Sequence, residues 1–556
     1  MLVKRSLSFV FAFVIAFLAG CGGYGRQTSG VVPTSLVVTP MMSSQSIGDS
    51  QQFIATATFS DNSTRNVTAQ AGWTSSATSV AMVTLAGLAN PIAQGDTTIS
   101  ASYSAAGRSL TASAALHVTV PDLQSISIVP STTQLELGAN QQFVATGRLT
   151  DGSNRDLTQA VSWSSSDQNV LRVNTSPGRI GLANTRGPGT ATIRASLNGF
   201  SAASPVTVIR RVPKFLYAAG DTGIIGYSIN PNTGALAPLP GGTFSATGFI
   251  RSLARTRDRK FLYAADSDTR AIWGFRIDPS GALVQVPGSP FTMGAGNSFQ
   301  SPFSVLASPT SDFLFMTDFG TGLLTTFAIG ADGSLAAQGS SVNVGSSPFR
   351  ATISYDGRFT YQTSSTPAQI AGFSIDENGV LAAIGRGTIA TGARPDDVTV
   401  DPSGRFLYAT LSDGSPGGVP PAVLGFAIDS LTGGLTPLPG SPFNGGDGPF
   451  STATDASGRF LYVGSAGTDS SGGGISGFSI DSDTGVATAI PGASLSTRLF
   501  SISVAVDPSA QFVYVGHRGN QGIQAFRIDQ QTGALTEITG SPFSALDTVF
   551  AITTTY

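Results

Sequence analysis

Short runs of alternating apolar and polar residues, separated by Gly, Pro, Asn and Asp, continue along the chain from about residue 33 to the end. The run Ile126-Ser127-Ile128-Val129-Pro130 is one example. Alternation with a period of two is typical of half-buried strands, and turn residues every 8 to 12 positions are typical of sandwiches and barrels. The pattern predicts an all-β chain.

Residues 33–210 contain two copies of one unit. Gln52-Phe53, Asp61, Thr68 and Trp73 recur 90 residues later as Gln142-Phe143, Asp151, Thr158 and Trp163. Short alternating strands around one tryptophan predict two β-sandwiches, at 33–120 and 121–210, each with its Trp in the core. The Trp-x-Ser-Ser segments at 73–76 and 163–166, with Gly187-Pro188-Gly189-Thr190 downstream, resemble bacterial Ig-like domains of group 2. The resemblance implies stalks or spacers on surface proteins, some with adhesive roles.

A second repeat fills residues 211–556. An aromatic pair, two residues apart, recurs seven times at intervals of 46 to 54 residues: Phe215/Tyr217, Phe261/Tyr263, Phe313/Phe315, Phe359/Tyr361, Phe406/Tyr408, Phe460/Tyr462 and Phe512/Tyr514. About 49 residues per unit is the size of a four-stranded propeller blade. The first unit lacks a leading strand and the chain ends with a surplus one, Val549 to Thr553. We therefore predict a seven-bladed propeller whose C-terminal strand completes blade 1.

The repeated Phe-Leu-Tyr, Ile-Asp-x-x-Thr-Gly-Ala-Leu and Pro-Gly-Ser-Pro-Phe segments resemble the seven-bladed lactonase family. That family includes 6-phosphogluconolactonase-like and muconate-cyclising propellers. Within each blade the strands are called A, B (which carries the aromatic pair), C and D, from the innermost strand outward. The resemblance implies a ligand site at the central channel, on the face formed by the D-to-A and B-to-C loops of the blades. Polar residues that we expect at these loops are Arg251, Arg350, Arg394, Asp396, Asp397, Arg498, Asp266, Asp268, Asp318, Asp413, His517 and Arg518.

Arginine in this set suits two-pronged binding of a carboxylate or phosphate, and His517 suits proton transfer near neutral pH. The predicted ligand-binding residues are Arg251, Asp266, Asp318, Arg350, Arg394, Asp397, Arg498 and His517. If the propeller is catalytic, the candidates are His517, Arg350, Arg251 and Asp318. Cyclising members of the family use His, Glu and Arg together, whereas this propeller has one His and two Glu. We expect Glu377 in a C-to-D turn and Glu537 in an outer strand, both away from the channel.

The first twenty residues have the pattern of an export signal. Lys4 and Arg5 precede an apolar run from Leu7 to Leu18, which is too short to span a bilayer. Leu18-Ala19-Gly20-Cys21 resembles the bacterial lipobox, and Cys21 is the one cysteine in the chain. The resemblance implies cleavage after residue 20 and lipidation of Cys21, with residues 21–32 as a tether. The alternative is an ordinary signal peptide with a chance cysteine.

Charge and composition narrow the function further. The 30 Lys and Arg and 33 Asp and Glu give a net charge of −3 without a basic cluster, which disfavours nucleic acid as a partner. One cysteine excludes cysteine-based metal sites, and we expect no metal and no cofactor.

The sequence thus predicts a lipid-anchored protein of the cell envelope, at the outer membrane or cell surface or on the periplasmic side. Its propeller would be a binding head for a protein or glycan. The alternative is an extracytoplasmic lactone hydrolase, so whether the protein is an enzyme stays open.

Overall fold

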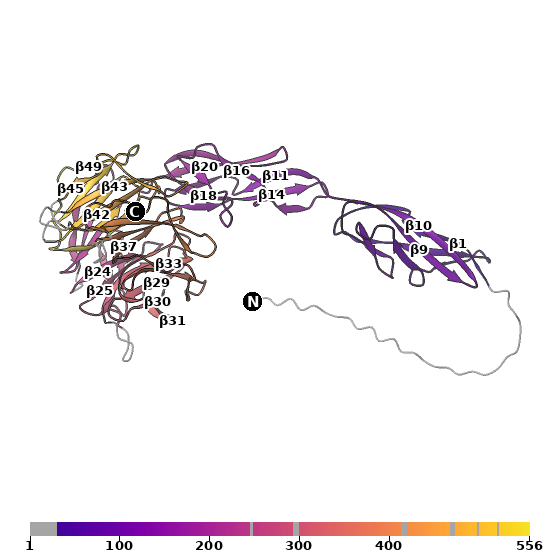
Figure 1. Cartoon of the computed structure of the whole chain (residues 1–556), viewed down its shortest axis with the longest axis horizontal. Helices are drawn as coiled ribbons and strands as arrows, with labels where there is room; N and C mark the ends of the chain where they lie inside the picture. Colours follow the sequence, from indigo (N-terminus) through magenta and orange to yellow (C-terminus); the bar gives the residue numbers. More distant parts are fainter. Residues whose placement is uncertain are drawn as a thin grey trace, which may run out of the picture. The chain divides into compact units, whose positions relative to one another are not determined.

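A computed structural model describes residues 31–244, 248–292, 300–412, 420–467, 473–497, 500–519 and 522–556 (Figure 1). The predicted signal peptide, Cys21, Asp413 and Arg498 lie outside these ranges. Within the described ranges all regular elements are strands, so the predicted all-β class is confirmed. The same ranges hold no helix long and apolar enough to cross a membrane.

The chain forms two compact units: residues 1–123 with 149–153, and residues 124–148 with 154–556. The first unit contains an Ig-like sandwich. Its sheets are, in spatial order, β1 (Pro33–Thr39), β4 (Ile54–Phe59) and β5 (Thr64–Asn66); β2 (Met42–Ser46), β10 (Arg108–Thr119), β9 (Gly95–Ala105) and β6 (Gly72–Ser75); and β3 (Gln51–Gln52), β8 (Leu88–Pro91) and β7 (Ala81–Val83).

The second unit begins with a sandwich of the same topology. Its sheets are β11 (Leu123–Val129), β14 (Val144–Leu149) and β15 (Asn154–Asp156); β12 (Thr133–Glu136), β20 (Phe200–Ile209), β19 (Gly189–Leu197) and β16 (Ser162–Ser165); and β13 (Asn140–Gln142), β18 (Leu182–Thr185) and β17 (Leu171–Val173). The repeated tryptophans lie in the two cores as predicted, each 7% exposed. Trp73 Nε1 donates to Thr68 O (2.9 Å) and Trp163 Nε1 to Thr158 O (3.0 Å).

Seven sheets with four strands along their main path form the propeller. Blade 1 contains β21 (Phe215–Gly220), β22 (Ile224–Ile229), β23 (Leu236–Phe244) and β50 (Val549–Thr554). Blade 2 contains β24 (Ile250–Arg255), β25 (Phe261–Asp266), β26 (Ala271–Ile277) and β27 (Leu283–Gln285), and blade 3 contains β28 (Pro302–Ala307), β29 (Phe313–Asp318), β30 (Leu323–Ile329) and β31 (Leu335–Asn343). Blade 4 contains β32 (Ser346–Ile353), β33 (Phe359–Thr366), β34 (Ala368–Ile375) and β35 (Leu381–Ala383), with β36 (Ile389–Ala390) paired to β34. Blade 5 contains β37 (Pro395–Val400), β38 (Phe406–Leu411), β39 (Ala422–Ile428) and β40 (Leu435–Pro437). Blade 6 contains β41 (Pro449–Thr454), β42 (Phe460–Ser465), β43 (Gly474–Ile480) and β44 (Ala487–Ala489), with β45 (Leu495–Ser496) paired to β43, and blade 7 contains β46 (Ser501–Val506), β47 (Phe512–His517), β48 (Ile523–Ile528) and β49 (Leu535–Glu537).

The ring closes through the C-terminal strand. β50 pairs antiparallel with β21, with Tyr217 opposite Thr553, and the sheet order is β23-β22-β21-β50. The innermost strands of successive blades contact one another around the channel, β50 included. The prediction that the last strand completes blade 1 is confirmed.

The aromatic pairs join each blade to the next. Six tyrosine hydroxyls donate to a glycine carbonyl in the C-to-D turn of the following blade: Tyr217 to Gly281, Tyr263 to Gly333, Tyr361 to Gly433, Tyr408 to Gly485, Tyr462 to Gly533 and Tyr514 to Gly234. Blade 3 has Phe315 in place of tyrosine, and there Thr326 Oγ1 donates to Gly379 O (3.0 Å). A buried phenol needs a hydrogen-bond partner, so this repeat fixes the blade spacing as well as filling the core.

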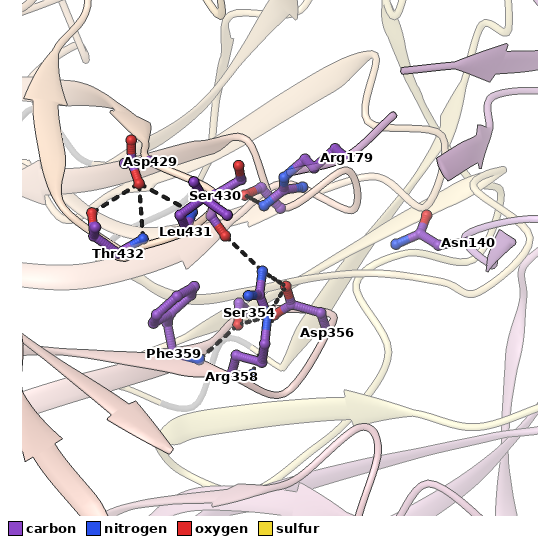
Figure 2. A network of polar contacts seen from close by, with 12 residues as sticks. Asn140, Arg179, Ser354, Asp356, Arg358, Phe359, Asp429, Ser430, Leu431 and Thr432 are labelled. Atoms are coloured by element: carbon purple, nitrogen blue, oxygen red, sulfur yellow. Dashed lines mark hydrogen bonds and ion pairs between the residues drawn. The ribbon is translucent and has the colours of Figure 1, made fainter. Parts of the chain in front are cut away.

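The second Ig-like domain packs against the A-to-B and C-to-D turns of blades 5 and 6. Arg179 Nη2 donates to Gly404 O (2.8 Å), Asn140 Nδ2 to Pro402 O (3.2 Å) and Ser430 Oγ to Pro177 O (3.1 Å). Figure 2 shows how this surface of the propeller is ordered: Asp429 accepts from the amides of the 429–432 turn, and Arg358 Nη2 donates to Ser430 O (2.7 Å). The domain therefore has side-chain contacts with the propeller that a simple spacer would not need.

Candidate functional site

A cavity of about 730 Å³ lies at the mouth of the propeller channel, where the inner strands begin and the B strands end. Its size is typical of a small-molecule site. Its described lining holds six phenylalanines, four arginines and one carboxylate: Phe303, Phe319, Phe349, Phe450, Phe500, Phe550, Arg251, Arg350, Arg394, Arg518 and Asp396. The predicted Arg251, Arg350 and Arg394 are thus brought together at one site.

The phenylalanines come from one position of the repeat. Phe303, Phe349 and Phe450 each follow a proline near the start of an inner strand, and Phe550 occupies the same place in β50. Proline is tolerated at such strand starts because no ladder hydrogen bond is lost there. In blade 5 the residue after Pro395 is Asp396 instead. Sequence reasoning missed this ring of phenylalanines, although the Pro-Phe pairs were a visible signal for it.

Three of the rings form one cluster on blades 3 and 4. The ring centroids of Phe303 and Phe319 are 5.5 Å apart, those of Phe303 and Phe349 are 5.6 Å apart, and those of Phe319 and Phe349 are 5.5 Å apart. Tilted and edge-to-face contacts at this spacing are favourable and hold the rings in place. Each of the three remains partly exposed, so together they give the cavity a firm apolar wall.

Arg251 is surrounded by aromatic rings. Its Cζ lies 4.5 Å from the centroid of Phe550, 5.1 Å from that of Phe249 and 5.6 Å from that of Phe303. Its Nε donates to Ser267 Oγ (3.2 Å), and no acidic side chain in the described part of the chain forms an ion pair with it. Burial, and then the nearby Arg350 guanidinium, lower the pKa of Arg251.

Arg350 spans the channel beneath the cavity. Its Nη1 donates to Arg251 O (2.9 Å) and its Nη2 to Phe550 O (2.8 Å), which connects β32 to β24 and β50. Burial lowers its pKa, and the Asp397 carboxylate partly offsets that effect. With both terminal nitrogens bonded to the main chain, Arg350 serves as the floor of the cavity.

Arg394 is paired with a carboxylate. Its Nη2 lies 2.8 Å from Asp396 Oδ1 and 3.2 Å from Ser412 Oγ, and its Cζ lies 5.1 Å from the Phe349 centroid. Asp396 is buried and its Oδ2 accepts from Ser412 N (3.1 Å). The pair is held in place and contributes little net charge.

Three other predicted residues make contacts within their own blades and do not line the cavity. Asp266, Asp318 and His517 occupy the same repeat position, at the end of strand B, and all three are buried. Asp266 accepts from Thr269 N and Trp273 Nε1, and Asp318 accepts from Gln300 N, Gly320 N and Thr321 N. His517 Nδ1 lies 3.5 Å from Ser501 Oγ. None of the three is among the residues that line the cavity.

Asp397 joins two blades. Its Oδ2 accepts from Thr452 N (2.8 Å) and Ser451 Oγ (3.2 Å) on the inner strand of blade 6. Burial raises the pKa of Asp397, while Arg350 acts in the opposite direction. Its hydrogen bonds are therefore structural.

The described lining of the cavity holds no glutamate. Glu377 lies in the turn between β34 and β35 and Glu537 in β49, and both are exposed, as expected from the sequence. Among the described residues no group of three or more His, Cys, Asp or Glu is placed to hold a metal ion. The arrangement suits recognition of a negative charge and an apolar surface; an acid and a base that face each other are not part of the described lining.

Comparison with known families agrees with this architecture. Residues 33–112 and 122–208 match the family described as "Bacterial Ig-like domain (group 2)", and residues 215–352 and 435–545 match "Lactonase, 7-bladed beta-propeller". The chain carries two bacterial Ig-like domains and a lactonase-type propeller. Both family resemblances that the sequence indicated are confirmed.

Solved structures share the propeller fold. A periplasmic gluconolactonase of Pseudomonas aeruginosa is 19% identical, with a TM-score of 0.51, over 62% of this chain and 99% of that chain. A Bacteroides fragilis protein named provisionally as a 6-phosphogluconolactonase is 20% identical, with a TM-score of 0.52, over 62% of this chain and 98% of that one. At these identities the likeness concerns the fold.

A curated relative is Ice-binding protein 1 of Shewanella frigidimarina. It is 36% identical over 197 residues, which is 34% of this chain and 22% of that protein. The match thus spans about a fifth of the relative's length.

Proposed function

We propose that this chain is an exported envelope protein, anchored by lipid at Cys21, whose propeller binds a ligand in the Phe/Arg-lined cavity. The observation that carries the proposal is the cavity's position. It opens on the D-to-A and B-to-C face, whereas the second Ig-like domain packs against turns of the opposite face. The second Ig-like domain therefore does not cover the cavity, which supports a role for it in binding a ligand.

The lining favours an anionic ligand carried by a protein or a glycan. Four arginines and one aspartate stand in the described lining of the cavity, so positive charge is in excess among these residues. Arginine binds carboxylates through two parallel hydrogen bonds, and aromatic walls contribute contact area at little entropic cost. No basic surface cluster supports nucleic acid as the ligand.

The second candidate function is extracytoplasmic lactone hydrolysis. The match of residues 215–352 and 435–545 to the lactonase family and the fold shared with a periplasmic gluconolactonase favour it. The positions of the acid–base candidates disfavour it: His517 is buried beside Ser501, and both glutamates lie away from the cavity. Because fold alone does not carry activity, we place binding first.

Export and lipid attachment rest on the first 21 residues, and the Ig-like domains are compatible with a surface location. Membrane fractionation of cells that express the full chain or Cys21→Ser tests the anchor. The proposal expects the full chain with the membranes and Cys21→Ser in the soluble extracytoplasmic fraction. Equal membrane association of both would overturn the anchor.

The binding function is tested with the purified full chain on arrays of glycans and envelope proteins, beside hydrolysis assays with sugar-acid and aryl lactones. We expect a ligand whose binding is lost in Phe349→Ala and retained in Glu377→Gln, which changes an exposed turn away from the cavity. Lactone turnover above background that Phe349→Ala or His517→Ala reduces would establish the enzyme instead.

A further inference from the structure

In the described lining of the cavity, the half-buried guanidinium with hydrogen-bond donors left for an anion is that of Arg251. Arg350 has both terminal nitrogens on backbone carbonyls, and Arg394 is paired with the buried Asp396. Arg518 is exposed at the rim, where water and salt screen its charge. Among the described residues, Arg251 is thus the half-buried cation of the lining that has no carboxylate partner. One guanidinium edge of this kind suits a ligand with one carboxylate.

The rings around Arg251 determine how an anion can approach. Phe550, Phe249 and Phe303 lie within 4.5 to 5.6 Å of its Cζ. Ser267 Oγ takes the Nε hydrogen, whereas Nη1 and Nη2 bond to no other described residue. An anion must therefore meet the edge of the guanidinium that carries these two nitrogens. The planar carboxylate fits that edge with two parallel hydrogen bonds.

The rest of the lining suits an apolar body. The Phe303, Phe319 and Phe349 rings form a wall, and Phe450, Phe500 and Phe550 continue it around the mouth. Within the described lining, the polar side chains beside the arginines are few: Ser301, Ser412 and Asp396, of which the last two already contact Arg394. A hydroxyl-rich sugar acid would leave several hydroxyls without partners, which costs binding free energy.

We propose that the cavity binds a monocarboxylate whose body is apolar and carries a flat ring, with the carboxylate on Arg251 and the ring against Phe303, Phe319 and Phe349. This inference rests on the proposed function of the propeller as a binding head. It narrows the ligand to a small amphiphilic acid, free or displayed on a partner. A cavity of about 730 Å³ holds such a molecule.

Calorimetric titration of the full chain with matched probes tests the inference. The probes are 3-phenylpropionate, its amide, glucuronate and the lactone 3,4-dihydrocoumarin. We expect 3-phenylpropionate to bind about tenfold or more tightly than the amide, because charge-assisted hydrogen bonds are lost with the charge. Glucuronate should bind more weakly than 3-phenylpropionate.

Three variants separate recognition from general damage. Arg251→Met should remove the preference for the acid while it leaves the amide affinity unchanged, and Arg251→Lys should retain part of the preference. Phe319→Ala should weaken acid and amide alike, by about tenfold. The control Arg194→Ala changes an exposed residue of β19 in the second Ig-like domain and should change neither affinity. Thermal transitions of all variants check that they fold.

The outcomes distinguish the two proposals. Tighter binding of glucuronate than of 3-phenylpropionate, or an acid preference that survives Arg251→Met, overturns the monocarboxylate and leaves the binding head intact. If none of the four probes binds, the monocarboxylate proposal is also overturned. The glycan and protein arrays test the binding function of the propeller separately. Hydrolysis of 3,4-dihydrocoumarin that Phe319→Ala reduces overturns the binding head itself.

Discussion

The two Ig-like domains have one topology and different surroundings. Their three sheets have the same strand order, and in both the tryptophan donates to a threonine carbonyl five residues earlier. The first domain forms a compact unit of its own, whereas the second forms one unit with the propeller. The shared core residues set the fold, so the difference must come from residues outside the core.

A four-residue insertion carries much of that difference. Gly87 follows Val83 by four positions in the first domain, whereas Gly181 follows Val173 by eight positions in the second. Both glycines have a positive φ. A Cβ at Gly87 would lie 2.6 Å from Phe53 O, and a Cβ at Gly181 would lie 2.5 Å from Phe143 O, so the two glycines occupy equivalent positions. The longer loop contains Pro177 and Arg179, which bond to the propeller.

Amino-acid differences on the neighbouring strands account for further contacts between the second domain and the propeller. Arg172 in β17 donates to Ser482 O of blade 6 (2.7 Å), and the equivalent residue of the first domain is Met82, which is 55% exposed. Asn140 in β13, which bonds to Pro402 O, corresponds to Ser50. Docking thus depends on a few polar side chains added to an unchanged sandwich.

Arg179→Ala should have the largest effect on this difference. Arg179 is buried and donates to Ser403 O and Gly404 O. Its loss leaves both carbonyls without their charged donor, at a cost of about 3 kcal/mol in the free energy of unfolding. Calorimetry should show the second domain melting apart from the propeller. Arg148→Ala, on an exposed position of the same domain, is the control, and an unchanged thermogram for Arg179→Ala would contradict the docking role.

Trp73→Phe and Trp163→Phe should destabilise the domains by about 1–2 kcal/mol each, because each leaves a threonine carbonyl without its indole donor. In urea unfolding, Trp73→Phe should shift the transition of the first domain alone. Trp163→Phe should also lower the stability of the unit that contains the propeller. Identical unfolding curves for the two variants would argue against the division into two units.

Arg172→Met, which installs the residue of the first domain, should cost about 1 kcal/mol. The hydrogen bond to Ser482 O is lost together with an ion pair to the exposed Asp483, which contributes little, and the methylene contacts remain. Thermal unfolding of the second unit measures it. The reciprocal Met82→Arg in the first domain should change nothing. If the two substitutions have equal effects, Arg172 does not contribute to docking.

The smallest expected effect concerns pH. Asp156 accepts from Thr158 N (2.8 Å), and hydrogen bonds to Thr158 lower the pKa of Asp156 below its usual 3.8; the first domain has Asn66 in this role. Because the pKa is lower in the folded state, the ionised carboxyl stabilises the folded domain at pH values above 3.8. That contribution is lost as the pH falls below 3.8 and through the folded-state pKa. The second domain should therefore lose slightly more stability on acidification. Asp156→Asn should remove the difference when unfolding is followed with tryptophan fluorescence in single-Trp variants.

The sequence predicted the fold well because its signals are local and repeated. The alternating strands, the tryptophan at an offset of 90 and the seven aromatic pairs each recur, so one interpretation applies to every copy. The surplus strand at Val549 had one available place, in blade 1. The tyrosine-to-glycine hydrogen bonds between blades went unrecognised, because the partners are 64 or more residues apart in sequence.

The candidate site was predicted less completely. Arg251, Arg350 and Arg394 reach the cavity, whereas Asp266 and Asp318 accept hydrogen bonds from their own turns and His517 lies beside Ser501 of the same blade. A polar residue at the end of a strand can cap a turn or face a channel, and the sequence pattern is the same for both. The choice depends on which amides the neighbouring loop brings within reach.

For this protein, the sequence by itself determined the all-β class, the two sandwiches and a seven-bladed ring closed by its last strand, because hydrophobic periodicity and turn residues act within each repeat. Only the tertiary structure decided that Arg350 is a floor, that Arg251 lies among phenylalanine rings and that the second Ig-like domain packs on the propeller. Each of these depends on contacts between residues of different blades or domains. The burial and the electrostatic surroundings of a side chain are set by those contacts, which a local sequence pattern does not contain.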